Sequence, residues 1–407
     1  MKIAILVTEF PKLSETFILN QITDLLEKGH EVTIFALCAS HENKIHSDVK
    51  KYNLLQLTSY INIPAKRIDR FIKAIFLVIS NFHKGPIKIL KSINIFKYRE
   101  EAFSLNLLYY LITFLGSEFD IIHSHFGPNG IIGAYLKEIG IPGKYLTNFH
   151  GYDVNSYPRI KGEDTYKNLF KVGDIFFANT NFTKQRLIQL GCIDSKIIIL
   201  PVGLNLDRYK FIDRERQRNQ PLTILSVGRL VEKKGHEYAI KAIKKIINLN
   251  KDIVYYIAGN GPMKKTLEKL IADLEITSYV KLLGAAEQNE VYDLYKKSDI
   301  FVLPSITASD GDCEGQALVI QEAQATGLPV ISTFHNGIPE GLLDGVSGFL
   351  VNEKDVDALA ERITYLIDHP EMRQKMGVEG RHFVESNYDI KLLNQKLICV
   401  YEKVLKR

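Results

Sequence analysis

The sequence is poor in cysteine and contains no long apolar segment. Its four cysteines are scattered over 407 residues, with no CxxC pair and no histidine cluster beside them, so the sequence predicts neither a disulfide framework nor a zinc site. No stretch approaches the roughly 18 apolar residues that a membrane span needs. Low-complexity tracts and repeats of fixed period are also missing, which excludes a disordered or repeat protein. We therefore expect a globular, cytoplasmic protein.

The length and the pattern of apolar runs predict two domains. A chain of 407 residues exceeds the roughly 250–300 residues at which a single hydrophobic core stops growing. Short, continuous apolar runs alternate with segments of helical period, which is typical of parallel strands buried on both faces of a sheet. After Gly348 the pattern becomes purely helical. We expect two doubly wound α/β domains and a helical tail, divided into an N-terminal domain 1–203, a polar linker 204–221, a C-terminal domain 222–385 and a final helix 386–407 that packs back on the N-terminal domain.

The segment from Ser305 to Gly348 carries the densest set of chemical groups. An apolar strand ends at Ser305, a loop follows, and a helix is expected to begin near Gln316. Ligands of doubly wound sheets lie at the carboxyl ends of the strands, facing helix N-termini. Backbone amides and the helix dipole can hold a diphosphate there without a metal ion. The residues predicted to contact it are Gly315, Gln316, Ala317 and Leu318.

Two glutamates flank this predicted helix start. Glu314 precedes the helix, and Glu322 follows about two turns into it, roughly 12 Å along the axis. One phosphate cannot bind both, so we assign Glu314 to a sugar and Glu322 to ribose hydroxyls, because carboxylates accept hydrogen bonds from paired hydroxyls. From spacing alone an alternative stays open, in which Glu314 is a charge favoured by the helix dipole and Glu322 an exposed helical charge.

Two cations follow the first strand of the second predicted domain. Arg229 ends the segment SVGR, and Lys234 comes five residues later. Arginine binds an anion through its planar fork and lysine as a point charge, so the two can converge on one phosphate. Ordinary surface charges are the alternative. The next strand ends in a turn that contains Asn260 and Gly261, for which a simple tight turn is an equally good explanation.

The stretch from Glu314 to Glu322 (EGQALVIQE) closely matches the E-x7-E signature of retaining GT-B glycosyltransferases, and Gly337 to Glu340 (GIPE) continues the same pattern. The chain resembles family 4 of the glycosyltransferases over nearly its whole length, with Gln316 as a departure. The resemblance implies two Rossmann-like domains facing across a cleft and transfer of a hexose from a nucleoside-diphosphate sugar, most often a UDP-sugar. It also implies retention of the anomeric configuration, with no metal or other cofactor. It assigns Arg229 and Lys234 to the donor diphosphate, and further donor contacts to Asn260, Gly261 and Leu283.

The first domain is expected to supply the acceptor side. His150 and Asp153 match the family's F-H-G-x-D pattern, which implies a donor-sugar contact for His150 and an acceptor contact for Asp153. Glu9 to Phe17 (EFPKLSETF) and His125 to Pro128 (HFGP) resemble the subgroup that contains the colanic-acid glycosyltransferases of exopolysaccharide assembly. We expect Ser14 to cap the first helix with Glu15 in its first turn, and Ser14 and Thr16 to present backbone amides to a diphosphate or to the acceptor. A plain helix cap is the alternative. The predicted acceptor residues are Asp153, Ser14, Glu15, Thr16 and His125.

A basic stretch between Lys66 and Arg99 contains nine lysines and arginines and a single acid, Asp69, a local balance of +8 in a chain of net charge +5. Phenylalanine, isoleucine and leucine alternate with these charges. The pattern is typical of helices that lie on an anionic membrane surface, and a lipid-linked acceptor would require such contact. Core-facing helices with solvated basic faces would look the same. We expect no nucleic-acid partner.

The predicted catalytic residues are Glu314, His150, Arg229 and Lys234. Because Glu314 is expected to contact sugar hydroxyls and no nucleophile is evident opposite it, we favour front-face transfer, in which the leaving phosphate accepts the acceptor's proton. Two alternatives stay open. One is a sugar-nucleotide epimerase or sugar phosphorylase on the same fold, and the other is a non-catalytic protein that binds a sugar nucleotide in a polysaccharide assembly complex.

Overall fold

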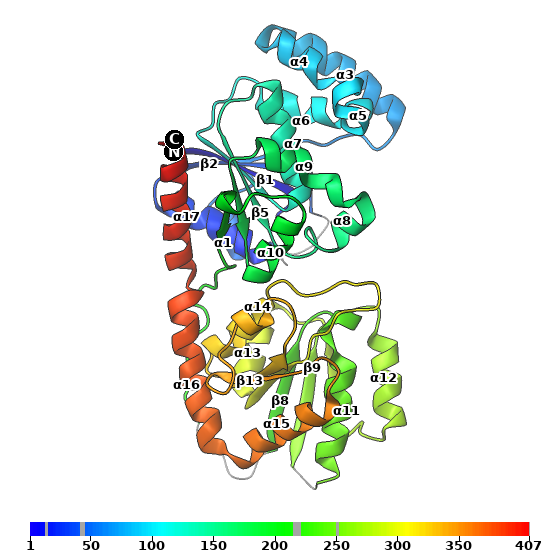
Figure 1. The fold of residues 1–407 in the computed structure, drawn as a ribbon, viewed down its shortest axis with the longest axis vertical. Coiled ribbons are helices and arrows are strands. Elements are labelled where there is room, and N and C mark those ends of the chain that lie inside the picture. Colours follow the sequence, from blue (N-terminus) through cyan, green and yellow to red (C-terminus); the bar gives the residue numbers. More distant parts are fainter. Residues whose placement is uncertain (13–14, 41–44, 215–220, 250–251, 407) are drawn as a thin grey trace. The chain divides into compact units, whose positions relative to one another are not determined.

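The computed structural model describes residues 1–12, 15–40, 45–214, 221–249 and 252–406. The chain divides into two compact units. Unit 1 comprises Met1–Asn179, Thr183–Leu200 and Asn394–Arg407, and unit 2 comprises Thr180–Phe182 and Pro201–Leu393. Each unit contains one parallel sheet with helices on both faces (Figure 1). The prediction of two Rossmann-like domains with a helical C-terminus is therefore confirmed.

Unit 1 has a seven-stranded sheet in the order β3-β2-β1-β4-β5-β6-β7, in which every neighbouring pair is parallel. Its strands are β1 (Lys2–Phe10), β2 (Glu31–Ala39), β3 (Thr58–Tyr60), β4 (Ile121–His125), β5 (Lys144–Phe149), β6 (Ile175–Ala178) and β7 (Ile197–Ile199). Its larger helices are α1 (Thr16–Glu27), α3 (Arg67–Asn81), α5 (Ile95–Phe103), α6 (Asn106–Phe114), α7 (Gly127–Ile139) and α10 (Asn181–Gln189). The shorter ones are α2 (Ser47–Lys51), α4 (Pro86–Ser92), α8 (Ser156–Lys161) and α9 (Lys167–Val172).

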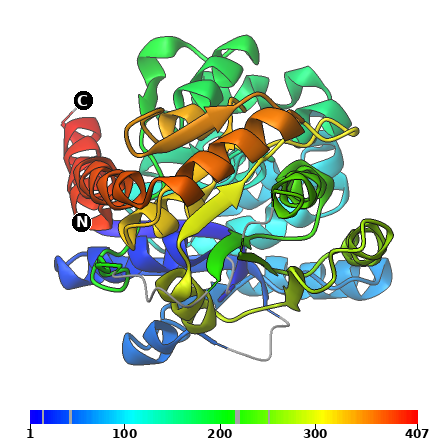
Figure 2. The same ribbon diagram turned by 90° about the horizontal axis from the view of Figure 1, so that it is seen from below.

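The central strand β1 shows why the apolar runs of this sequence are continuous. Ile3 and Ile5 pack in one cluster with α1 and the last helix, α17 (Ile390–Leu405), while Ala4 and Leu6 pack in another cluster on the opposite face with α6 and α7. A strand covered on both faces needs an apolar side chain at every position. The start of the chain lies beside α17 in unit 1 (Figures 1 and 2), because Leu397, Tyr401 and Val404 of α17 complete the core beside α1.

Unit 2 has a six-stranded parallel sheet in the order β10-β9-β8-β11-β12-β13. Its strands are β8 (Leu222–Val227), β9 (Ile253–Ala258), β10 (Val280–Gly284), β11 (Ile300–Leu303), β12 (Val330–Thr333) and β13 (Gly348–Val351). Its helices are α11 (His236–Ile247), α12 (Lys264–Asp273), α13 (Gln288–Lys297), α14 (Leu318–Ala325), α15 (Val356–Asp368) and α16 (Pro370–Asn387), with a 3-10 turn η5 (Glu232–Lys234) after β8. The sequence interpretation missed β13, because it predicted only helices after Gly348, whereas the next helix, α15, begins at Val356.

The segment predicted as a polar linker is packed against unit 2 where the structure describes it. Tyr209 is buried, and the Arg214 guanidinium donates to the carbonyl oxygens of Tyr295, Ser298 and Thr326. The planar guanidinium group of an arginine can donate hydrogen bonds to several buried carbonyl oxygens at once. A highly charged segment can therefore still pack against the domain. None of the described helices combines the length and apolar content that crossing a bilayer would require.

Candidate functional site

Three loops of unit 2 follow β8, β11 and β12 at the carboxyl edge of the sheet, where doubly wound folds bind ligands. Gly235 adopts a φ of +64°, and a Cβ at this position would lie 1.9 Å from the carbonyl oxygen of Pro304. Glycine is therefore required for the loop after β8 to approach the loop after β11. This approach sets Lys233 and Lys234 beside the loop that carries Glu314.

The carboxylate of Glu314 is buried between two lysines. Its Oε1 lies 3.0 Å from Lys234 Nζ and 3.8 Å from Lys233 Nζ, and Lys233 also pairs with Asp312 at 3.1 Å. Burial alone would raise the pKa of the Glu314 carboxyl, but the ammonium groups of Lys234 and Lys233 outweigh burial and hold the pKa below its ordinary value. The structure thus brings together two of the four predicted catalytic residues, and Glu314 is ionised.

A buried histidine positions Glu314 from the other side. The backbone N–H of Glu314 donates to His335 Nε2 at 3.0 Å, and His335 Nδ1 lies 2.6 Å from Glu353 Oε1. Because Nε2 accepts a hydrogen bond, the ring proton is on Nδ1 and is donated to Glu353. Glu353 also accepts the backbone N–H of Thr307 at 2.8 Å. The sequence interpretation missed His335 and Glu353, although only Asn336 separates His335 from the GIPE element.

Glu322 lies in the second turn of α14, and two tyrosine hydroxyls hold its carboxylate. Tyr209 donates to Oε1 at 3.0 Å and Tyr295 donates to Oε2 at 2.9 Å. Burial raises the pKa of the Glu322 carboxyl, and these hydrogen bonds act in the opposite direction. Each oxygen retains a lone pair for a further donor. Glu314 and Glu322 therefore have separate sets of partners, as two separate contacts require.

The helix predicted to begin near Gln316 begins two residues later, at Leu318. The Gln316 amide explains the delay, because its Oε1 accepts the Val202 N–H at 2.8 Å and its Nε2 donates to the Val202 carbonyl at 2.9 Å. Its side chain thus anchors the backbone instead of facing a ligand. Within the part of the chain that the structure describes, the backbone N–H groups of Gly315, Gln316, Ala317 and Leu318 donate to no protein acceptor, so all four remain available to an anion.

The remaining predicted donor residues lie at or just after the carboxyl ends of β8, β9 and β10 in unit 2. Arg229 is exposed and forms no ion pair with Glu314 among the described residues, so the structure does not bring this predicted catalytic residue into the cluster. The side chain of Asn260 accepts the backbone N–H of Gly261 at 2.9 Å, and Leu283 is exposed at the end of β10. These contacts fix the turn after β9, and the nucleotide role of the three residues stays a prediction.

The histidines of unit 1 form a stack at the carboxyl ends of β4 and β5. The rings of His123 and His125 are 5.0 Å apart and those of His125 and His150 are 5.8 Å apart, both nearly parallel. His123 hydrogen bonds to Asn148 and Tyr401 and is fully buried, so its role is structural. His125 is also fully buried, so no surface is left on it for the predicted acceptor contact.

Asp153 is completely buried and binds backbone instead of facing solvent. Its carboxylate accepts the N–H groups of Gly127, His150 and Gly151 at 2.9–3.0 Å. These bonds tie the turn after β5 to the start of α7. In this structure Asp153 therefore positions His150, whereas the sequence had predicted that Asp153 itself contacts the acceptor. His150 belongs to unit 1 and Glu314 to unit 2.

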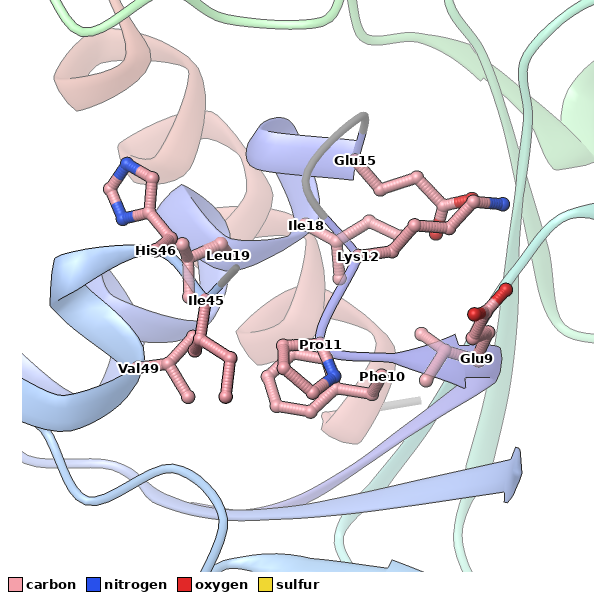
Figure 3. Close-up of a pocket in the computed structure, with 11 residues that line it drawn as sticks. Glu9, Phe10, Pro11, Lys12, Glu15, Ile18, Leu19, Ile45, His46 and Val49 are labelled. Carbon is pink, nitrogen blue, oxygen red and sulfur yellow. The ribbon is translucent and has the colours of Figure 1, made fainter. Parts of the chain in front are cut away.

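The N-terminal acceptor residues lie after β1, and Ser14 lies outside the described residues. Helix α1 begins at Thr16, so Glu15 is the N-cap and not part of the first turn. Figure 3 shows the Lys12 and Glu15 side chains alongside one another, and they pair at 2.8 Å. The adjoining cavity, lined by apolar residues such as Phe10 and Val49, measures about 10 Å³. This volume holds no more than a water molecule.

A larger pocket of unit 1 was not foreseen from the sequence. It measures 560 Å³, within the usual range of ligand pockets, and lies beside Thr8 and Cys38, near the carboxyl ends of β1 and β2. Glu101 of α5 accepts a hydrogen bond from Asn106 at 3.2 Å within it, and burial raises the pKa of the Glu101 carboxyl. Further lining side chains are Asn62, Arg70, Tyr110, Asn129 and Tyr157.

Because the histidine stack is buried, we expect the free energy of unfolding to decrease as the pH falls. Burial lowers the pKa of His123 to about 4 and of His150 to about 3, and holds that of His125 well below its ordinary value. The unfolded chain therefore binds protons first as the pH falls below about 6.5, and stability present above that pH is lost toward pH 4. Each buried imidazole should destabilise the fold by about 2 kcal/mol at pH 5 relative to pH 7.

Urea unfolding of a His125→Phe variant at pH 7 and pH 5 measures this effect. The variant should lose about 2 kcal/mol less than the parent between the two pH values. His83→Gln, on the exposed segment after α3, is the matched control and should follow the parent. An equal loss for His125→Phe and the parent would contradict the assignment.

Comparisons with known proteins agree with this geometry. Residues 14–208 match the model of Glycosyltransferase Family 4, and residues 207–383 match that of Glycosyl transferases group 1. A Salmonella typhimurium protein that carries the name colanic acid biosynthesis glycosyltransferase WcaL is 33% identical, covering 99% of this chain and 100% of its own. The amylovoran biosynthesis glycosyltransferase AmsK of Erwinia amylovora is 32% identical, covering 99% of this chain and all of its own.

Solved structures share the whole fold. A glycosyltransferase of Rickettsia africae superposes with a TM-score of 0.72 at 20% identity, covering 100% of this chain and 99% of its own. Anabaena HepE, in complex with UDP and glucose, also gives a TM-score of 0.72, at 16% identity over 99% of this chain and all of its own. The full-length match to relatives more than 30% identical, together with the two family models, shows that the chain belongs to family 4 of the glycosyltransferases.

Proposed function

We propose that the chain transfers a hexose, with retention of configuration and without a metal ion, from a UDP-sugar to a lipid-linked saccharide during the synthesis of a cell-surface polysaccharide. The names of WcaL and AmsK support the pathway, and the UDP and glucose bound to HepE support the donor. The observation that carries the proposal is the buried Glu314 carboxylate between Lys233 and Lys234, next to four backbone N–H groups that donate to no acceptor among the described residues. The transfer reaction would take place at the inner face of the membrane.

The chemistry follows from the charges of this cluster. The bond between the sugar's anomeric carbon and the diphosphate breaks, and a bond to the acceptor oxygen forms on the same face. The acceptor's proton passes to a departing phosphate oxygen. Lys234 and the N–H groups of residues 315–318 bind the charge that develops on the diphosphate, which is the role a divalent cation has in other transferases. Glu314, held by His335, accepts hydrogen bonds from the sugar hydroxyls.

The acceptor side of the proposal rests on the 560 Å³ pocket of unit 1. Carboxylate and amide groups, such as those of Glu101 and Asn106, bind hydroxyl groups, and the tyrosine rings of Tyr110 and Tyr157 offer apolar surface to the C–H faces of a sugar. The pocket is formed in part by α3, α5 and α6. Of these helices, α3 and α5 also carry residues of the basic stretch, so a saccharide in this pocket would lie close to the basic and apolar surface of unit 1.

Nucleotide binding tests the donor. We expect UDP at about one hundred times its Kd to raise the melting temperature by roughly 5 °C or more, because a ligand that binds only the native state stabilises it. GDP at the same concentration should give a smaller shift. EDTA should change neither the UDP-induced shift nor the rate of transfer. A larger shift with GDP would overturn the assignment of UDP, and loss of transfer in EDTA would overturn metal independence.

Product analysis separates transfer from the alternatives. With a UDP-hexose and a membrane fraction that contains lipid-linked saccharides, we expect release of UDP and a new glycosidic bond whose anomeric configuration, read by NMR, is that of the donor. Conversion of the sugar nucleotide without a new bond would indicate an epimerase. Binding of UDP without any reaction would indicate a non-catalytic protein.

A further inference from the structure

The helices α3, α4 and α5 expose an unusual number of large apolar side chains. Figure 1 shows these helices together at one end of unit 1, where each of them packs against α6. Phe96 of α5 is 100% exposed, and Phe76 of α3 is 71% exposed. The other exposed large apolar residues of this region are Ile68, Phe71, Ile72, Ile75, Ile79, Phe82, Ile87, Leu90, Ile93, Ile95 and Phe103. Contiguous apolar surface of this kind marks an interaction site.

Helix α3 has two apolar faces, of which its own unit covers only one. Ala74, Leu77 and Val78 pack in the core cluster that includes α6. The six exposed apolar side chains of α3 recur at intervals of three and four residues, which places them together on the other side of the helix. A helix that served only the core of unit 1 would carry polar residues on that side. The second face therefore requires a partner outside the unit.

The charges on the same helices identify that partner. Three of the basic side chains already have protein partners. Arg70 and Lys73, in the first two turns of α3, donate to backbone carbonyl oxygens, and Lys97 pairs with Glu138. The remaining basic side chains of the stretch lie at its surface among the exposed apolar residues, with Lys66, Arg67, Lys84, Lys91 and Arg99 exposed and Lys88 partly exposed. Exposed cations beside large apolar groups complement a surface that is anionic at its face and apolar beneath it.

We propose that the exposed face of α3, α4 and α5 docks on an anionic phospholipid bilayer, with Phe76 and Phe96 inserted below the headgroups and Lys84 and Lys91 at the lipid phosphates. The inference deepens the proposed function, and it rests on that function for the partner's role as the carrier of the acceptor. A second copy of this chain is the competing occupant. The net basic charge of the face opposes self-association, because two copies would bring like charges together.

The chain contains no tryptophan, which makes a single reporter possible. A Phe96→Trp variant is mixed with vesicles of phosphatidylcholine that contain about one third phosphatidylglycerol, and with vesicles of phosphatidylcholine alone. With the anionic vesicles we expect a blue shift of the tryptophan emission, quenching by brominated lipid, and flotation of the protein with the vesicles. Neutral vesicles should give none of these. Equal binding to both kinds of vesicle, or binding to neither, would overturn the proposal.

Two variants in the Phe96→Trp background separate charge from insertion. Replacement of Lys84 and Lys91 by glutamine should lower the partition into anionic vesicles by roughly thirty-fold, because each basic residue near the surface contributes about a fivefold factor. The matched control replaces Lys265 and Lys269, two exposed lysines of α12 in unit 2, and should leave partition unchanged. Phe76→Gln should lower the partition into anionic vesicles without changing the melting temperature, because the Phe76 side chain is 71% exposed and buries little surface against the protein.

The same samples exclude the competing occupant. Sedimentation velocity without vesicles should give a monomer at all concentrations. A concentration-dependent dimer that Phe76→Gln abolishes would overturn membrane docking in favour of self-association. UDP binding is measured by calorimetry in the absence of vesicles, so a failure of the donor proposal and a failure of docking would be recognised separately.

Discussion

Glu314→Gln should lower the rate of sugar transfer by roughly a hundred- to a thousand-fold, the usual effect of removing one group that stabilises a transition state in a closed site. The carboxylate would lose its negative charge, while Lys234 at 3.0 Å would be released from its ion pair. In the parent, the Glu314 carboxylate competes with the diphosphate for the Lys234 ammonium group. Without that competition the ammonium group should bind a diphosphate more tightly. We therefore expect the affinity for UDP to stay equal or to increase while kcat falls.

The matched control for this variant is Glu232→Gln. Glu232 lies on the turn η5 immediately before Lys233 and Lys234, and its carboxylate is exposed and hydrogen bonds to Ser309. Its replacement should leave kcat within about twofold, as expected for an exposed side chain away from the chemistry. Steady-state kinetics and calorimetry with UDP measure both quantities. If Glu314→Gln retained more than a tenth of the parent kcat, Glu314 would not be a catalytic residue.

Glu322→Ala should weaken UDP binding by roughly a hundred-fold or more, because two hydrogen bonds from ribose hydroxyls to a charged acceptor contribute about 1.5–3 kcal/mol each. The substitution also removes the acceptor of the Tyr209 and Tyr295 hydroxyls. Tyr295 is completely buried, and without Glu322 its hydroxyl would retain only a long contact of 3.4 Å to the Val319 carbonyl oxygen. The poorly satisfied hydroxyl should therefore lower the stability of the fold by about 1–3 kcal/mol. Calorimetry with UDP and urea unfolding report the two effects independently.

The variants Tyr209→Phe and Tyr295→Phe distinguish a ribose contact from a structural role. Each removes a tyrosine donor and leaves the Glu322 carboxylate in place, so UDP affinity should change by less than about tenfold. If Glu322→Ala bound UDP as tightly as the parent, the ribose assignment would fail. If the tyrosine variants lost UDP binding as completely as Glu322→Ala, Glu322 would act only through the packing of α14.

Most strands of both sheets could be predicted because each is a continuous apolar run, and burial on both faces leaves little room for another pattern. The strand Ile253–Ala258 and the strand Ile300–Leu303 are examples. The start of α14 could not be predicted as well, because it depends on the hydrogen bonds of Gln316 to Val202, 114 residues earlier in the chain. A local pattern contains no information about so distant a partner.

For the candidate site, too, the sequence predicted one part and missed another. Glu314, Glu322 and Lys234 could be chosen from residue type, spacing and family resemblance, but their contacts could not. The role of His335 follows from Glu353, which lies on a different strand end, and the environment of Glu322 follows from Tyr209, 113 residues away. Asp153 shows the opposite case. The motif identified the residue, but only the three backbone donors around it reveal that its carboxylate positions the turn.

The place of α17 in unit 1 has a consequence for synthesis on the ribosome. Leu397, Tyr401 and Val404 belong to the same core cluster as Ile3 and Ile5 of the first strand. About 190 residues of unit 2 are translated between Leu200 and Asn394, which takes roughly 10 to 40 s at 5–20 residues per second. During that time the nascent first unit has its sheet but lacks the helix that closes it. Apolar surface beside α1 stays exposed until α17 emerges, so unit 1 is completed only after unit 2 has been synthesised.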